Sequence, residues 1–206
     1  MGDTFERKNR NEKLETYEWD DIWFEQANSE CRNRVLYIGD SISCGMRKIA
    51  TKMADGKYLF DGLGTSKAID NPYYKELISL VARQQKERRI VLFNNGLHGF
   101  HLNCEQYSEY YEEMVRFLME VFSREQIMIL LTTAVTGLDN SIVIERNKAV
   151  STIAGKYSLP IVDLYSVSFE NIDKLRDGVH MTEEGYAILV RVLLEEIDEM
   201  QRGREE

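Results

Sequence analysis

A serine near the start of the chain and an acid–histidine pair near its end have the residue types that nucleophilic catalysis requires. Ser41 directly follows an apolar run at 34–39, and Asp177 stands three residues before His180. A serine hydroxyl becomes an effective nucleophile when a histidine accepts its proton and an acid orients that histidine. Of the three histidines in the chain, His180 has an acid at a suitable local offset. These residues are the candidate nucleophile, base and base-orienting acid.

Each of these signals also has an ordinary structural interpretation when taken alone. A Gly-Asp-Ser sequence after a strand is commonly a helix N-cap, and an Asp-x-x-His sequence is even less specific. One signal follows the first predicted strand, however, and the other precedes the last predicted helix, which favours a shared site. If Ser41 heads a helix, the backbone N–H groups and the helix dipole there favour a developing oxyanion.

Apolar runs and amphipathic segments alternate along the chain. The predicted strands are 34–39, 58–60, 90–94, 127–131 and 161–164. The predicted helices, with apolar positions three and four apart, are 72–88, 105–123, 141–158 and 182–200. We expect Ser141 and Thr182 to cap the last two helices. Continuous apolar runs of this kind predict a parallel sheet with helices on both faces.

The segment before the first predicted strand is aromatic. Residues 14–32 carry Trp19, Ile22 and Trp23 at helix-like spacing, which predicts an amphipathic helix docked on the sheet. An aromatic lip that contacts a substrate is the alternative interpretation. With 206 residues, two prolines and no linker-like tract, the chain is expected to form a single domain over 1–206, with 1–33 as a helical segment packed on it.

Composition excludes several function classes. The formal net charge of −9 argues against a nucleic-acid partner, which needs a basic face. The chain has no window of about 18 apolar residues, so no membrane span is predicted. The odd cysteine count and the absence of an apolar leader favour a cytoplasmic protein. The oligomeric state stays open.

Two further groups of residues could do chemistry but have better structural interpretations. His98, His101 and Cys104 are closely spaced, yet they lack a fourth partner at a recognisable zinc spacing, so no metal site is expected. Cys44 lies close behind Ser41 and is expected to be a buried structural cysteine.

In a parallel sheet, ligands bind beyond the carboxyl ends of the strands. The segments 61–66 and 94–99 follow the second and third predicted strands and are small, polar and glycine-bearing. We therefore expect them to complete a site around Ser41.

Two sequence blocks resemble a known family. Residues 35–41, Val-Leu-Tyr-Ile-Gly-Asp-Ser, resemble the first block of the SGNH, or GDSL-type, hydrolases, and 177–180, Asp-Gly-Val-His, resembles their final block, which supplies the acid and the base. The two blocks span nearly the whole chain. The resemblance implies a flavodoxin-like three-layer α/β/α fold with a five-stranded parallel sheet, hydrolysis of acyl esters, and no cofactor.

The family's second block supplies a glycine N–H group to the oxyanion hole. In this chain Gly64, expected in a Gly-Thr-Ser turn, is the first candidate for that donor, and Gly62 is the alternative.

The third block departs from the family's common Gly-x-Asn-Asp pattern. Residues 94–98 read Asn-Asn-Gly-Leu-His and resemble a variant seen among carbohydrate-esterase-like members. Asn94, at the strand end, is the expected side-chain donor to the oxyanion. His98 is the alternative, because it replaces the asparagine if Gly-Leu-His is aligned with Gly-x-Asn. Asn95 should face the opposite side of the strand from Asn94.

These expectations lead to one favoured function and two alternatives. The chain would hydrolyse a small acyl ester, with acetyl on a carbohydrate as the favoured substrate, through an acyl-enzyme on Ser41. A non-catalytic ligand-binding protein on the same fold is the alternative, and a flavodoxin-like nucleotide binder ranks last. A separation beyond about 4 Å between the Ser41 hydroxyl and His180 Nε2 would favour the binding protein.

Overall fold

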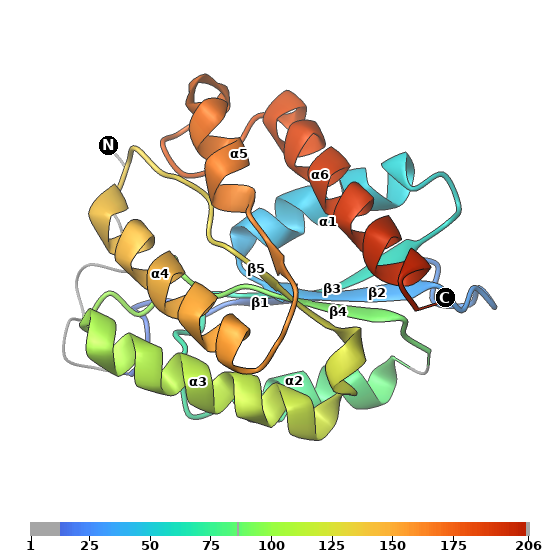
Figure 1. The fold of residues 1–206 in the computed structure, drawn as a ribbon, viewed down its shortest axis with the longest axis horizontal. Helices are drawn as coiled ribbons and strands as arrows, with labels where there is room; N and C mark the ends of the chain where they lie inside the picture. Colours follow the sequence, from blue (N-terminus) through green and yellow to red (C-terminus); the bar gives the residue numbers. More distant parts are fainter. Residues whose placement is uncertain (1–12, 86, 205–206) are drawn as a thin grey trace.

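The computed structural model describes residues 13–85 and 87–204, and a six-stranded sheet lies at its centre (Figure 1). The strands are β1 (Asp20–Trp23), β2 (Arg34–Gly39), β3 (Leu59–Thr65), β4 (Ile90–Phe93), β5 (Ile127–Leu130) and β6 (Ile161–Val162). Their order across the sheet is β1-β3-β2-β4-β5-β6. β1 pairs antiparallel with β3, and all the other pairs are parallel.

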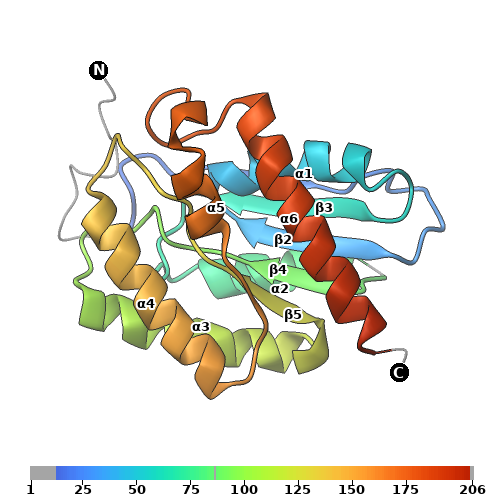
Figure 2. The ribbon, with the colours of Figure 1, turned by 45° about the horizontal axis from the view of Figure 1, so that its top comes forward.

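Helices cover both faces of this sheet. They are α1 (Ser41–Met53), α2 (Tyr74–Gln84), α3 (Cys104–Val121), α4 (Asn140–Lys156), α5 (Leu164–Glu170) and α6 (Glu183–Arg202). Helices α1, α5 and α6 lie on one side, and α2 and α3 lie on the other (Figures 1 and 2). The expected three-layer α/β/α arrangement is therefore confirmed. No helix in the described part of the chain is long and apolar enough to cross a membrane.

The burial of β2 explains its continuous apolar sequence. Val35 and Tyr37 lie in the core cluster that includes α1 and α6, whereas Leu36 and Ile38 lie in the cluster that includes α2 and α3. Because side chains alternate between the faces of a strand, a strand covered on both faces must be apolar at every position.

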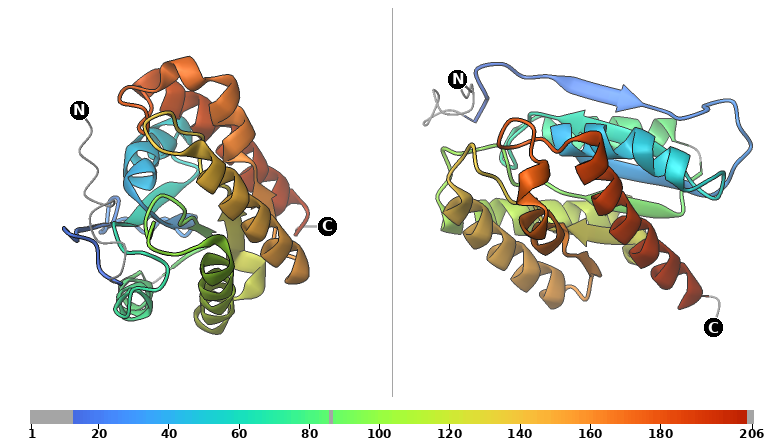
Figure 3. Two further views of the ribbon diagram at one scale, coloured as in Figure 1. Left: turned by 90° about the vertical axis from the view of Figure 1, so that its left-hand side faces the viewer. Right: turned by 90° about the horizontal axis from the view of Figure 1, so that it is seen from above.

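Two predictions about the sheet are wrong. The sheet has six strands rather than five, and the helix predicted at 14–32 is absent: no helix occurs in the described residues before β2. Instead β1 forms the outer edge of the sheet (Figure 3). Its two acids bind basic side chains from elsewhere, with Asp20 2.9 Å from Lys67 and Asp21 2.8 Å from Arg47. These long-range ion pairs, together with the pairing to β3, hold a segment whose local spacing favours a helix.

Each of the other predicted elements overlaps an observed one, and the largest difference is in β3, which runs to Thr65 instead of ending at residue 60. Thr182 caps α6 as expected, because its hydroxyl accepts from Gly185 N at 3.2 Å. The cap of α4 is Asp139 rather than Ser141, since the Asp139 carboxylate accepts from Ser141 N at 3.0 Å. The short helix α5 has no counterpart among the predicted elements.

The topology fixes where a site can form. From β2 the chain passes to β3 on one side, and β4 then lies on the other side of β2. In such sheets the crevice at the carboxyl ends of the two diverging strands is the usual ligand site. Ser41 follows β2 at this crevice.

Candidate active site

Ser41 is the first residue of α1, and only Asp40 separates it from the end of β2. The Asp40 side chain caps this helix by accepting from Ile42 N at 2.8 Å. A Cβ atom on Gly39 would lie 2.9 Å from Ser43 Cβ, so the tight passage from strand to helix requires glycine there. The hydroxyl is thus presented at a helix N-terminus, where unpaired N–H groups favour negative charge.

The structure brings Ser41 together with the predicted acid–histidine pair. The Ser41 hydroxyl lies 2.8 Å from His180 Nε2, and His180 Nδ1 lies 2.9 Å from an Asp177 carboxylate oxygen. In a neutral imidazole that donates from Nδ1 to the carboxylate, Nε2 is the acceptor. The serine proton therefore has a base in hydrogen-bond contact.

The acid and the base share one closed turn. Leu175 and Met181 form an isolated antiparallel bridge, and Arg176 N donates to His180 O at 2.7 Å. Inside this turn the Asp177 carboxylate also accepts from the backbone N–H groups of Val179 (3.1 Å) and His180 (2.8 Å). A histidine three residues after an aspartate can therefore bond to it through both its backbone and its ring.

The charge state of Asp177 follows from these contacts. Partial burial raises the pKa of the carboxyl, but the hydrogen bonds from the His180 backbone, the His180 ring and the Val179 backbone outweigh that effect and lower the pKa to about 2. The carboxylate is therefore ionised at neutral pH and can hold an imidazolium.

Two glycines that sequence reasoning did not single out brace this turn. Gly178 has φ +87°, and its carbonyl accepts from Thr136 N (2.8 Å) and Gly137 N (2.9 Å) in the segment after β5. A Cβ atom on Gly178 would lie only 2.7 Å from Gly137 N. The glycine in Asp-Gly-Val-His is the sequence signal for this close approach, but its partner segment is distant in the chain.

The predicted glycine donors lie elsewhere than expected. Gly64 and Gly62 are inside β3 rather than in a turn, because both pair with β2 on one side and with β1 on the other. Ser66 N donates to Trp19 O, and alternate residues of a strand donate to the same side, so the Gly64 N–H also points toward β1. The prediction that Gly64 lies in a turn is wrong, and its N–H points away from β2 and Ser41.

The Asn94 side chain forms hydrogen bonds within the protein. Its side-chain amide donates to Leu130 O at 2.9 Å and to the Thr132 hydroxyl at 3.1 Å. These two bonds use both amide hydrogens and join the end of β4 to the end of β5. Asn94 therefore has a structural role here and no donor left for an oxyanion. Asn95 donates its amide to Lys67 O at 2.9 Å.

His98, the alternative third-block candidate, is a buried neutral imidazole. Its side chain meets the edge of the Trp19 ring, with centroids 6.5 Å apart. Burial, helped by the positive charge of Arg146, lowers the pKa of His98 to about 4. The ring therefore stays uncharged at neutral pH.

This low pKa makes His98 a source of acid instability. His98 takes up its proton near pH 6.5 in the unfolded chain but only near pH 4 in the folded chain. The free energy of unfolding therefore decreases as the pH falls from 6.5 toward 4. At pH 4.5 the loss should be about 2 kcal/mol. Urea unfolding at pH 7 and 4.5 measures it. His98→Gln should show a correspondingly smaller loss between the two pH values, and equal losses in both proteins would contradict the assignment.

His101 and Cys44 also have structural rather than catalytic surroundings. His101 Nε2 lies 3.0 Å from a carboxylate oxygen of Asp70. Within the described residues, no group of three or more His, Cys, Asp or Glu side chains could hold a metal ion. Burial raises the pKa of the Cys44 thiol to about 11, so it is protonated at neutral pH.

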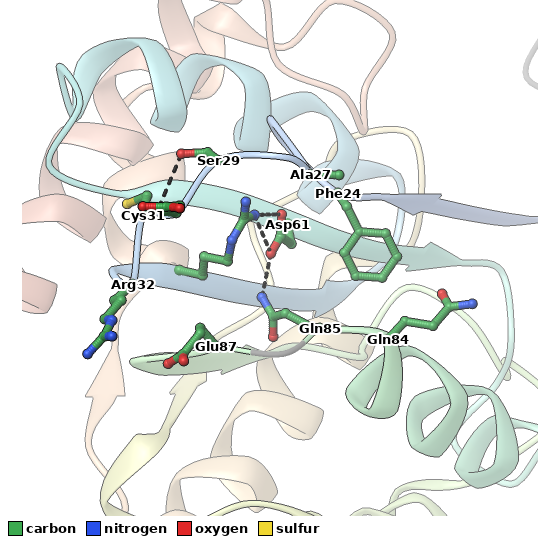
Figure 4. Close-up of a pocket in the computed structure, with 11 residues that line it drawn as sticks. Phe24, Ala27, Ser29, Cys31, Arg32, Asp61, Gln84, Gln85 and Glu87 are labelled. Carbon is green, nitrogen blue, oxygen red and sulfur yellow. Dashed lines mark hydrogen bonds and ion pairs between the residues drawn. The ribbon is translucent and has the colours of Figure 1, made fainter.

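A cavity of about 730 Å³ lies at the opposite, amino-terminal edge of the sheet (Figure 4). The Asp61 carboxylate beneath it accepts from Arg34 (2.8 Å), Gln85 (2.5 Å) and Glu25 N (2.8 Å). Because these buried groups satisfy one another, they tie the segment after β1 to the sheet. Nothing in this cavity connects it to the Ser41 chemistry.

Comparison with solved structures identifies the fold. The chain is similar to an acetyl xylan esterase, AlAXEase (TM-score 0.63, 14% identity, covering 79% of this chain and 98% of that one). It is also similar to a member of the lipolytic protein G-D-S-L family from Veillonella parvula (TM-score 0.64, 17% identity, 79% and 96%). A third similar structure is a lipase/acylhydrolase from Enterococcus faecalis (TM-score 0.63, 15% identity, 82% and 96%). No protein-family model and no curated protein matches the sequence. The chain therefore has the fold of the SGNH, or GDSL-type, hydrolases, at a low level of sequence identity.

Proposed function

We propose that this protein is a serine esterase that hydrolyses small acyl esters through an acyl-enzyme on Ser41. The observation that carries the proposal is the continuous hydrogen-bonded chain from the Ser41 hydroxyl through His180 to Asp177, with contacts of 2.8 and 2.9 Å. A non-catalytic binding protein on the same fold would have no need for this chain of contacts.

The proposed mechanism uses the same three residues in both half-reactions. The Ser41 oxygen attacks the ester carbonyl while its proton passes to His180 Nε2, and Asp177 stabilises the imidazolium without taking the proton. As the tetrahedral intermediate collapses, the C–O bond of the ester breaks and His180 protonates the departing alcohol. Water then attacks the acyl-enzyme, with His180 as base, and releases the acid and free Ser41.

Two donors are proposed for the oxyanion. The Ser41 N–H lies at the N-terminus of α1, where the helix leaves such groups without intrahelical partners. The neutral His98 imidazole replaces Asn94 as the proposed side-chain donor, since the Asn94 amide hydrogens are both used between β4 and β5.

A hydrophilic acetyl ester, with the acetyl group carried on a carbohydrate, is the proposed substrate. The names of the similar structures include acetyl xylan esterases. The catalytic side chains support an accessible site, since Asp177 is 44% exposed and His180 is 32% exposed. An open site suits a bulky polar alcohol better than a long acyl chain, which needs an apolar tunnel.

The test is turnover combined with covalent labelling. The purified protein should hydrolyse 4-nitrophenyl acetate and an acetylated xylo-oligosaccharide, and prefer acetate to octanoate as the acyl group. A fluorophosphonate probe should label Ser41, located by mass spectrometry, and labelling should persist in Cys44→Ala, which removes the cysteine thiol on α1. Absence of both turnover and labelling would favour the binding protein instead.

A further inference from the structure

Both tryptophans of the chain point to the same face of the edge strand β1. Trp19 precedes the strand directly, and Trp23 is its last residue. The neighbours of Trp19 in the chain are Glu18 and Asp20. Both bind the Lys67 ammonium, at 3.4 and 2.9 Å. Because successive side chains of an extended chain point to opposite faces, Trp19 points away from Lys67.

Trp23 lies against α1. Its ring centroid is 5.6 Å from the Arg47 guanidinium and 5.5 Å from the Lys48 ammonium, and both cations belong to α1. Its Nε1–H donates to a carboxylate oxygen of Glu25 at 2.9 Å. Since Trp19 and Trp23 are an even number of residues apart, they share this face, and the pair is called the aromatic face below.

The aromatic face is open to solvent. Trp19 is 37% exposed and Trp23 is 42% exposed, although tryptophan is highly buried on average. Seen from the side that carries α1, β1 lies beside that helix, and no helix of the described residues lies across it (Figure 3). Apolar residues scattered singly over a surface are ordinary, but two large rings on one face mark a contact surface.

The register of the sheet places Trp19 level with Ser41. Gly39, Gly64 and Asp21 lie opposite one another in β2, β3 and β1. Ser41 lies two residues beyond this row. Trp19 lies two residues beyond it in the same direction, because β1 runs antiparallel to β3 and the hydrogen bond to Trp19 O continues their ladder. Two strand spacings separate β1 from β2, so the aromatic face begins about 10 Å from the nucleophile, on the side of the sheet where α1 lies.

The composition of this surface fits a carbohydrate. Trp19 and Trp23 lie about 13 Å apart along the chain. Between them lies Asp21, paired with Arg47, and Lys48 lies beside the second ring. A sugar ring has an apolar face of C–H groups, which stacks on an indole, and a rim of hydroxyls, which bind charged groups. A long acyl chain or a lipid surface needs continuous apolar contact instead. Because one sugar ring does not span the distance between the indoles, the surface fits an oligosaccharide.

We propose that Trp19 and Trp23 bind the saccharide part of the ester, so that the substrate of Ser41 is an acetylated oligosaccharide and not an acetylated monosaccharide. This inference rests on the proposed function of Ser41. It assigns the aromatic face to parts of the substrate that are remote from the reacting carbonyl. Such contacts raise kcat/KM for an oligosaccharide ester but not for a small ester that cannot reach them.

Tryptophan fluorescence tests the binding without any substitution, because the chain has no tryptophan outside the aromatic face. The probes are unacetylated xylohexaose, mannohexaose and hexagalacturonate at millimolar concentration. At least one of them should reduce acrylamide quenching of the wild-type fluorescence in a saturable way, whereas the matching monosaccharide should have little effect. Unchanged quenching with all three would overturn the proposal.

Kinetics then links the aromatic face to hydrolysis. Trp23→Ala should lower kcat/KM for the acetylated form of the bound hexasaccharide about three- to tenfold more than kcat/KM for 4-nitrophenyl acetate, which has no sugar part. Trp19→Ala should act in the same direction, and Trp23→Phe, which keeps an aromatic ring, should lose less. Tyr73→Ala is the matched control, since Tyr73 is exposed but lies with Lys67 on the opposite face of β1, and it should change neither value.

The outcomes separate this proposal from the proposed function. An active wild type in which Trp23→Ala lowers kcat/KM equally for both esters overturns the role of the aromatic face alone. A dimer in sedimentation that Trp23→Ala dissociates, with no change in hydrolysis of the hexasaccharide ester, would assign the face to a second copy of the chain instead. A wild type that neither turns over nor labels at Ser41 overturns the proposed function, and the role of the aromatic face in hydrolysis with it. If the alanine variants do not fold, as judged by circular dichroism, the wild-type fluorescence still decides.

Discussion

Alanine in place of Ser41 or His180 is expected to lower kcat for an acetyl ester by about 10⁴- to 10⁶-fold, and the double variant should be no worse than either single one. The losses do not add because the hydroxyl and the imidazole, 2.8 Å apart, act as one unit: without the base the serine is a poor nucleophile, and without the serine the base has no proton to accept. Steady-state kinetics of the four proteins measures the effect.

A neighbouring serine supplies the matched control. Ser43 is buried two residues further along α1, and its hydroxyl donates to Asp40 O at 2.6 Å. Ser43→Ala therefore removes a serine hydroxyl beside the site but no proposed catalytic group, and kcat should stay within about tenfold of the wild type. Retention of more than a tenth of the activity in Ser41→Ala would show that another residue is the nucleophile.

The three residues of this chain of contacts could be predicted because their geometry is largely local. Asp177 and His180 bond within one turn of a few residues, and Ser41 is fixed by the direct passage from β2 into α1. Long apolar runs then predicted the parallel strands that bring the first and last blocks to one edge of the sheet. Only the bracing of Gly178 by Gly137 needed contacts that the sequence does not reveal.

The N-terminal edge strand β1 could not be predicted, because the contacts that hold it are not local. Trp19, Ile22 and Trp23 have helical spacing, and four residues are too few to show the alternation of a strand. β1 is held by partners far along the chain: its ladder with β3, the ion pair of Asp20 with Lys67 and that of Asp21 with Arg47. Tertiary contacts therefore outweigh the local pattern.

The surroundings of two oxyanion candidates, Gly64 and Asn94, were mispredicted because they depend on strand ends and pairing register. Gly64 lies in a strand because it pairs with both β2 and β1, and Asn94 donates to the protein because the end of β5 lies beside it. None of these neighbours is close in sequence. Gly64 instead has a testable role in the contact between β3 and α1.

Gly64→Ala is expected to destabilise the protein by about 2–3 kcal/mol, because overpacking in a dense core forces neighbouring groups to move. A Cβ atom at this position would lie 2.2 Å from the sulfur of Cys44. Cys44→Ala removes that sulfur and should cost only about 1 kcal/mol for the small void it leaves. The double variant Gly64→Ala/Cys44→Ala should therefore regain most of the stability that Gly64→Ala loses, with a favourable coupling energy of about 2–3 kcal/mol in urea unfolding.

Gly155→Ala is the control for this cycle, since a Cβ atom there has no neighbour within 4 Å. Gly155 lies in α4, where alanine should stabilise the helix by about 0.5–1 kcal/mol. Opposite signs for the two Gly→Ala changes would separate steric contact from backbone propensity. Alanine at 64 keeps its N–H pointing toward β1, so the double variant should also retain kcat for 4-nitrophenyl acetate within a few-fold. Equal destabilisation of the double variant and Gly64→Ala would mean that Cys44 is not the group that requires glycine in β3.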